Sequence, residues 1–245
     1  KRPFDFGAQF VNNLGCRVGH IAFRQPTSYI QNVFSWDMLM RQDLADLIQR
    51  MTTREEIVNS DDSISWQAHR EAELLEDQTL VDELDTYLDQ KPAIAQRSAA
   101  YFIIGKIGRN CLSEACASRL IGFSSKEKDK HALAGILLLL ADIPKSESVD
   151  VKPLFPLLKD KQWRVRHSAI QSLKRCQNAE AEDRLLEILA TTSDPYDATY
   201  CHATLNQIGT RKALPALAQN LKSRKHDVKV SAQAAIEAIE AREAS

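Results

Sequence analysis

The residues of this sequence that are best suited to chemistry are cations that recur at a nearly fixed interval. Four of them occupy equivalent places along the chain, and an indole and an imidazole flank the third. A row of cations beside an aromatic ring is what phosphate contact and base stacking require. The candidate binding residues are therefore Arg97, Lys130, Trp163, Arg166, His167 and Lys229.

The other reactive residues do not form a recognisable catalytic or metal-binding set. His131 and His167 each follow one of the recurring cations, so they should lie about 10 Å apart on neighbouring helices. That separation is too large for two ligands of one zinc ion, whose bonds are about 2 Å long. Gly105-Lys106 lacks the rest of a phosphate-binding loop, and no Gly-x-Ser-x-Gly nucleophile motif occurs. The sequence thus predicts no catalytic residue, no metal site and no cofactor.

Each anchor position opens a helix whose apolar residues lie on one face. Apolar side chains follow at positions three, seven and ten after every anchor, which is the spacing of a helical stripe. The steps between anchors are 33, 36, 32 and 31 residues, a period of one helical hairpin. The anchors are Arg97, Lys130, Arg166, Ala198 and Lys229, and the central apolar residues are Ile104, Leu137, Leu173, Leu205 and Ile236.

The helix that carries the third anchor resembles the short HEAT-like repeats named after phycobilisome lyases. Its segment Val165-Arg166-His167-Ser168-Ala169-Ile170-Gln171-Ser172-Leu173 matches the Val-Arg-x-x-Ala-x-x-x-Leu core of that family. The resemblance covers roughly residues 74–241, with a period shorter than the roughly 40 to 47 residues of the longer HEAT repeat. It implies an all-α fold, an α-solenoid of about five helical hairpins whose second helices line the concave side.

The resemblance implies two classes of function. The leading expectation is a non-catalytic scaffold that binds a protein or peptide partner on the concave face. The alternative is a nucleic-acid-binding protein that resembles the HEAT-like alkylpurine DNA glycosylases. A bilin lyase has only the repeat subtype in its favour, and the HEAT-type iron hydroxylases are excluded because no His in the chain is followed by Glu. The groove residues of the glycosylase alternative would be Trp163, Tyr196, Asp194, Arg166 and Lys130.

The resemblance also implies a structural role for the recurring cations. In HEAT-like repeats the arginine at this place commonly pairs with an aspartate from the turn between the two helices, and arginine suits such a bidentate pair. Acids near those turns are Asp89, Asp160, Asp194 and Asp227. We therefore expect a ladder of ion pairs rather than a column of cations that face a ligand, and we expect Trp163 to be packed.

The repeats divide the chain into an extension, residues 1–73, and an array, residues 74–245. The repeats are expected near residues 74–110, 111–144, 150–177, 179–209 and 211–241. In the extension, the Phe-rich segment 1–35 would cover the first hairpin, and Ser35 and the pair Thr53 and Glu56 would cap two helices. Gly108 is expected to end the second helix of the first repeat.

The charge and the cysteine content restrict the partners and the cellular compartment that we expect for the protein. The formal net charge is −1, but the balance is −8 in residues 1–90 and +7 in residues 91–245, an asymmetry that can direct a charged partner. The five cysteines include no Cys-x-x-Cys pair, so we expect buried thiols in a reducing compartment, the cytoplasm. The longest apolar run, 136–143, is too short to cross a bilayer, so no membrane is expected as a partner. The oligomeric state is not predicted.

Overall fold

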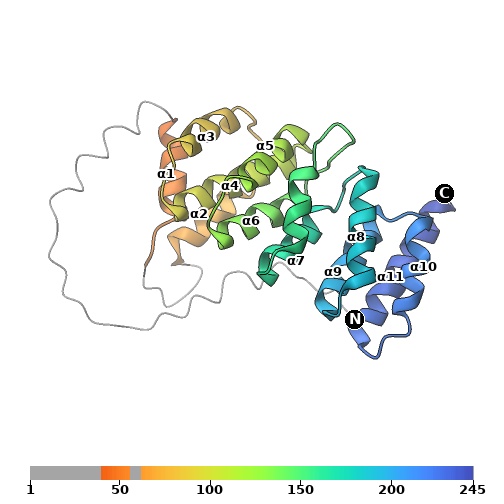
Figure 1. Ribbon diagram of the computed structural model, residues 1–245. Helices are drawn as coiled ribbons and strands as arrows, with labels where there is room; N and C mark the ends of the chain where they lie inside the picture. Colours follow the sequence, from red (N-terminus) through yellow and green to blue (C-terminus); the bar gives the residue numbers. More distant parts are fainter. Residues whose placement is uncertain (1–39, 56–61, 245) are drawn as a thin grey trace, which may run out of the picture. The chain divides into compact units, whose positions relative to one another are not determined.

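The computed structural model describes residues 40–55 and 62–244, which form a stack of helices (Figure 1). These residues contain no β-strand, and their extended backbone pairs only in an isolated bridge between Lys145 and Cys176. The predicted all-α solenoid of helical hairpins is therefore confirmed. The expected cap formed by residues 1–35, with its helix start at Ser35, lies outside the described residues.

Two helices precede the repeats, α1 (Gln42–Met51) and α2 (Ile64–Ala72), and both contact α4 of the first repeat. Residues 53–55 are not helical, and Glu56, the other residue of the expected capping box, lies outside the described residues. At the start of α2 the Ser63 hydroxyl accepts a hydrogen bond from the Trp66 amide at 3.2 Å, and the Glu55 carboxylate accepts one from the Ile64 amide at 2.6 Å. These two side chains satisfy amides that the first turn of α2 leaves without helical partners.

Five hairpins follow, and the second helix of each of the first four contacts the second helix of the next hairpin. The first and second helices are α3 (Leu80–Asp89) with α4 (Ile94–Asn110), α5 (Glu114–Ser124) with α6 (Lys130–Leu140), the 3-10 helix η4 (Lys152–Lys159) with α7 (Trp163–Ser172), α8 (Ala179–Thr191) with α9 (Pro195–Ile208), and η5 (Arg211–Ala213) continued by α10 (Leu214–Asn220) with α11 (His226–Glu243).

The central positions of the predicted stripes form the core of this stack. Ile104, Leu137, Leu173 and Leu205 are completely buried, whereas Ile236 in the last hairpin is half-buried against them. Burial of an aliphatic side chain of this size is worth about 2 kcal/mol, so one stripe per helix provides the main cohesion between neighbouring hairpins.

Gly108 does not end α4, which continues to Asn110. A Cβ atom at Gly108 would lie 2.7 Å from Ile143 Cδ1 and 2.8 Å from Cys116 Cβ. The glycine is therefore required by close packing of α4 against its neighbours, and the turn after α4 is made elsewhere.

That turn contains Leu112, whose φ of 51° lies in the left-handed region. Replacement of Leu112 by Gly is expected to raise the free energy of unfolding by about 0.5 to 1 kcal/mol, because Leu pays a steric cost in this conformation and its half-exposed side chain packs little. Urea unfolding followed by circular dichroism measures the change. A loss of stability would mean that the Leu112 side chain contributes more packing than strain.

The segment between the second and third hairpins is anchored by Lys145, which is completely buried. Its Nζ donates hydrogen bonds of 2.6 Å to the carbonyl oxygens of Leu140 and Ile143, at the end of α6. Burial lowers the pKa of the Lys145 ammonium to about 8. The amine thus donates to one carbonyl at the last residue of α6 and to one just beyond it, where helical hydrogen bonding has ended.

Candidate functional site

The first two anchor cations pair with acids of the following hairpin. Arg97 donates two hydrogen bonds of 2.9 Å to the two carboxylate oxygens of Glu127, and Lys130 Nζ lies 2.7 Å from Asp160 Oδ2. Burial alone would raise the pKa of Glu127, but bonds from Arg97, the Asp129 amide and Tyr101 lower it overall. Each pair connects two hairpins, because the acid follows its cation by 30 residues.

Arg166 holds the most extensive of these contacts. Its Nε lies 2.8 and 3.1 Å from the two carboxylate oxygens of Asp197, its Nη2 lies 3.2 Å from Asp194 Oδ2, and its Nη1 donates to the Asp160 carbonyl at 3.0 Å. The guanidinium of the third hairpin therefore binds the start of α9 in the fourth. Asp194 also caps α9, because its Oδ1 accepts the Tyr196 amide at 2.9 Å.

These contacts form the ladder of ion pairs that the sequence suggested, with a different set of acids. Asp160 and Asp194 take part, each with the cation of the preceding hairpin, and Glu127 and Asp197 were not foreseen. Asp89 and Asp227 hold no ion pair among the described residues. A spacing of about 30 residues between cation and acid is the sequence signal that identifies the true partners.

Lys229 is the exception in the column. It lies in the last hairpin, its side chain is exposed, and no acid of the described chain pairs with it. Ion pairs between hairpins thus engage Arg97, Lys130 and Arg166, whereas the Lys229 side chain faces solvent.

His167 is buried rather than partly exposed, with 6% of its surface accessible. Its Nε2 lies 2.9 Å from Asp197 Oδ1, so the ring donates its Nε2 proton to that carboxylate. The ring also lies against Trp163, Tyr196 and Tyr200, at centroid distances of 5.5, 6.3 and 4.7 Å. Burial lowers the pKa of His167 despite the nearby Asp197, so the ring is neutral near pH 7 and serves as a packed support.

His167, Asp194 and Asp197 bring ligand atoms within 4.8 Å of one another, a grouping that the sequence analysis did not foresee. The lone pairs of Asp197 are already used, because its oxygens accept bonds from Arg166, His167 and Thr192. A metal ion would have to displace the guanidinium of Arg166, which already pairs with both acids. The arrangement is therefore a closed ion-pair cluster and offers no ready ligand set for a metal.

Trp163 and Tyr196 lie at the surface above this cluster. They are 55% and 66% exposed, so the expectation that Trp163 is packed was wrong. Both residues lie in the first turn of their helices, where no further hairpin covers them. Beneath them His167 and Asp197 are fixed by hydrogen bonds, which makes the two rings a firmly supported apolar platform.

Cations without described ion pairs lie near the starts of the second helices. They lie in the turns that lead into α6, α7 and α11 or in the first turns of those helices, and all are exposed. The starts of α6 and α7 are in contact, since Arg164 Nη1 lies 3.3 Å from His131 Nδ1, and α9 packs between α7 and α11, with His202 Nδ1 in the middle of α9 lying 2.9 Å from Ser231 Oγ of α11. We call this surface the aromatic–basic rim, which comprises Lys128, Lys161, Trp163, Arg164, Tyr196, Lys225 and Lys229.

His202, which joins α9 to α11, is completely buried, and its Nε2 has no hydrogen-bond partner among the described atoms. Burial lowers its pKa to about 4, from about 6.5 in the unfolded chain. Between these two pH values the unfolded chain binds a proton that the folded chain does not, so stability is lost as pH falls from 6.5 towards 4.

Replacement of His202 by Leu is expected to remove about 2 kcal/mol of the stability difference between pH 7 and pH 5. Urea unfolding at both pH values measures this difference for the wild type and the variant. His131→Leu is the matched control, because it replaces an exposed histidine by the same apolar residue. An identical pH dependence in wild type and His202→Leu would show that the buried ring accepts a proton in the folded state.

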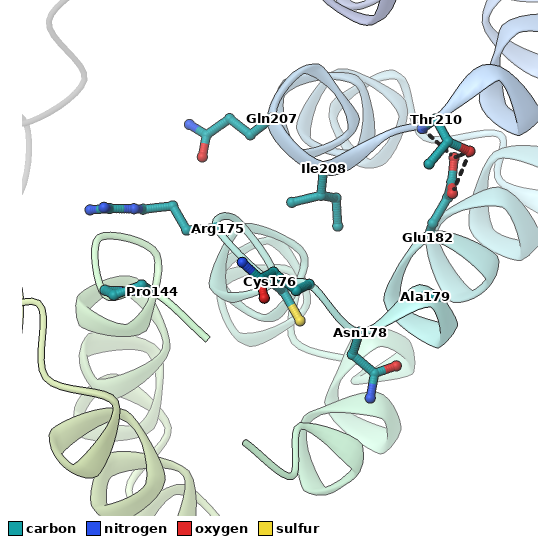
Figure 2. Close-up of a pocket in the computed structure, with 10 residues that line it drawn as sticks. Pro144, Arg175, Cys176, Asn178, Ala179, Glu182, Gln207, Ile208 and Thr210 are labelled. Carbon is teal, nitrogen blue, oxygen red and sulfur yellow. Dashed lines mark hydrogen bonds between the residues drawn. The ribbon is translucent and has the colours of Figure 1, made fainter. Parts of the chain in front are cut away.

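A cavity of about 620 Å³ lies at the other ends of these helices, between the α7–α8 turn and the end of α9 (Figure 2). Its charged groups are engaged: Glu182 accepts hydrogen bonds from the amide and hydroxyl of Thr210, and Arg175 Nη1 donates to the Asp142 carbonyl at 2.6 Å. Burial raises the pKa of Cys176, which disfavours the nucleophilic thiolate. The cavity therefore contains no assembled catalytic group.

Comparison with known proteins agrees with the hairpin architecture. A family model of HEAT repeats matches residues 119–203 and 151–240. Two designed armadillo repeat proteins superpose with TM-scores of 0.52 and 0.54 at 18% and 19% sequence identity, and in both cases 80% of this chain aligns with 99% of the other. The second of them was solved in complex with the peptide (KR)4. At this identity the likeness extends to the fold alone.

No curated protein matches the sequence. None of the described helices has the length and apolar character that a bilayer-spanning segment needs.

Proposed function

The chain belongs to the HEAT-repeat proteins, and from this premise we propose that it is a non-catalytic scaffold whose aromatic–basic rim binds a protein or peptide partner. The observation that carries this proposal is the exposure of Trp163 and Tyr196 above a rigid, internally satisfied polar cluster. Trp, Tyr and Arg are the residues that dominate the binding energy of protein interfaces. An aromatic pair that is held in place also loses little conformational entropy on binding.

The architecture supports the same proposal. A designed armadillo repeat protein of similar fold holds a peptide, which is what a stacked array of hairpins with one continuous helix layer can offer. The described cysteines are free thiols, and Cys116, Cys176 and Cys201 are buried, which supports the reducing environment of the cytoplasm as the proposed location.

Selection from a displayed library of random peptides tests the proposal. We expect peptides to be enriched on the wild-type protein and to lose at least about tenfold in affinity for a Trp163→Ala, Tyr196→Ala variant. The matched control is Leu74→Ala, Leu112→Ala, which removes two exposed apolar side chains near the opposite end of α4. Enriched peptides that bind the aromatic variant and the wild type equally well would contradict a binding role for this surface.

The DNA glycosylase alternative has one specific observation in its favour. The structure brings Trp163, Arg166, Asp194 and Tyr196 around one cluster, as that alternative required. However, the Asp194 carboxylate is bound by Arg166 and the Tyr196 amide, which leaves it poorly placed to act on a base. Tight, salt-sensitive binding of an oligonucleotide in the absence of peptide binding would favour this alternative over the scaffold.

A further inference from the structure

We infer that the partner of the aromatic–basic rim is an acidic peptide segment, in which carboxylates lie on both sides of an apolar side chain. The inference rests on the proposed scaffold function and specifies the chemistry of its ligand. It concerns the outward-facing charges of the rim, which differ from the charges of the ladder beneath it.

At the starts of the second helices, most of the acids are paired within the protein, whereas several of the cations are not. Of the acids in these turns, Glu127 and Asp160 bind the cations of the preceding hairpin, and Asp194 and Asp197 both bind Arg166. Asp129 is used as well, since its carboxylate accepts the amides of His131 and Ala132 at the start of α6. Most acids of these turns are thus bound by groups inside the protein, whereas Asp227, in the first turn of α11, is exposed and has no ion pair with a described residue.

The rim cations have no such internal partners. Lys128, Lys161, Lys225 and Lys229 are exposed and form no ion pair with a described residue. Arg164 is also exposed, and its guanidinium lies 5.2 Å from the Trp163 ring. The rim therefore presents a net positive surface although the formal charge of the chain is −1. The starts of α6, α7, α9 and α11 add the positive ends of their helix dipoles to the same edge.

Along the rim, cations and aromatic rings follow one another in a definite order. Cations lie in the hairpins of α6, α7 and α11, whereas the turn before α9, residues 192–194, carries none and contributes Tyr196 instead. Trp163 and Tyr196 thus provide an apolar interval between two groups of cations. A peptide can match this order by placing an apolar residue between acidic ones.

This interrupted order favours a peptide over a nucleic acid. A nucleic-acid backbone carries a charge at every phosphate, and at the turn before α9 it would meet no unpaired cation, because Arg166 is already bound there by Asp194 and Asp197. A peptide avoids this position because its charges can be spaced. Charge complementarity of this kind steers a partner and selects against basic segments.

The test uses a fluorescein-labelled peptide with four glutamates on each side of a central Leu-Phe pair. A second peptide carries lysine in place of every glutamate, and a twenty-nucleotide oligothymidylate represents nucleic acid. The rim variant is Lys161→Glu, Arg164→Glu. Its added acids lie at the start of α7, where the helix dipole favours them, so the fold should be retained.

The matched control variant is Arg109→Glu, Lys152→Glu, which changes the same number of charges. Arg109 lies in the last turn of α4 and Lys152 at the start of η4, and both are exposed. Retention of the wild-type circular dichroism spectrum establishes that each variant is folded. Fluorescence anisotropy then gives the dissociation constants at low and physiological salt.

We expect the acidic peptide to bind the wild type, to lose at least about tenfold in affinity for the rim variant, and to lose no more than about twofold for the control. Preference for the lysine peptide, or acidic-peptide binding that both variants weaken equally, would overturn the inference. Tighter binding of oligothymidylate than of either peptide would overturn it as well. Library peptides that depend on Trp163 and Tyr196 but contain no acidic residues would preserve the scaffold function and refute only its acidic ligand.

Discussion

Replacement of Leu173 by Asp is expected to lower the free energy of unfolding by about 4 kcal/mol or more. Leu173 is completely buried where the third hairpin meets its neighbours, and a carboxylate there would lose its hydration. Because each hairpin is stabilised by the next, the fourth and fifth hairpins should separate from the rest. Urea unfolding, followed by circular dichroism, should show a lower midpoint or two transitions.

The control for this experiment is Leu74→Asp, since Leu74 is 79% exposed. Its free energy of unfolding should change by no more than about 0.5 kcal/mol. A Leu173→Asp variant that unfolds like the wild type would show that the stripe is not the contact surface between hairpins.

Replacement of Asp197 by Ala is the second change with a large expected effect, a loss of about 3 kcal/mol. Asp197 is buried and accepts bonds from Arg166, His167 and Thr192, so its removal leaves a largely buried guanidinium with Asp194 as its one remaining carboxylate. Chemical unfolding measures the loss. The aromatic variant Trp163→Ala, Tyr196→Ala should cost much less, because its side chains are exposed.

Lys130→Met provides the matched control for Asp197→Ala. Lys130 also pairs with an acid of the next hairpin, but 42% of its side chain is exposed, and such surface pairs contribute about 1 kcal/mol or less. Equal losses of unfolding free energy in Asp197→Ala and Lys130→Met would contradict the larger contribution to stability that we assign to the buried cluster.

The hairpins could be predicted because their apolar stripes are local and periodic. Three apolar residues per helix, at positions three, seven and ten after an anchor, were sufficient to locate the buried faces. Structural features that depend on a single side chain were harder to predict from the sequence. The segment of η4, for example, has Pro153 near its start and Pro156 inside, and because proline lacks an amide hydrogen the predicted first helix of this hairpin forms as a 3-10 helix. The burial of Lys145 was not foreseen, since its carbonyl partners are defined only after α6 has ended.

The candidate site was harder to predict because charge alone does not show whether a side chain faces a neighbour or solvent. Arg97, Lys130 and Arg166 share a sequence position with Lys229, yet the first three have a following hairpin whose acids they bind. The cations without ion pairs are turn residues such as Lys128 and Lys161, whose neighbours in sequence gave no sign of their exposure. Trp163 is exposed because it lies in the first turn of its helix, and its apolar character suggested the opposite.

The fluorescence of Trp163 tests the central claim, that a peptide partner binds on the rim. In a Trp36→Phe, Trp66→Phe variant, Trp163 is the sole indole in the chain. Titration with a peptide enriched from the displayed library should shift its emission to shorter wavelength, in proportion to the bound fraction measured by anisotropy, because the peptide removes the half-exposed ring from water. Saturable peptide binding with an unchanged Trp163 emission would contradict the claim and place the binding surface elsewhere on the array.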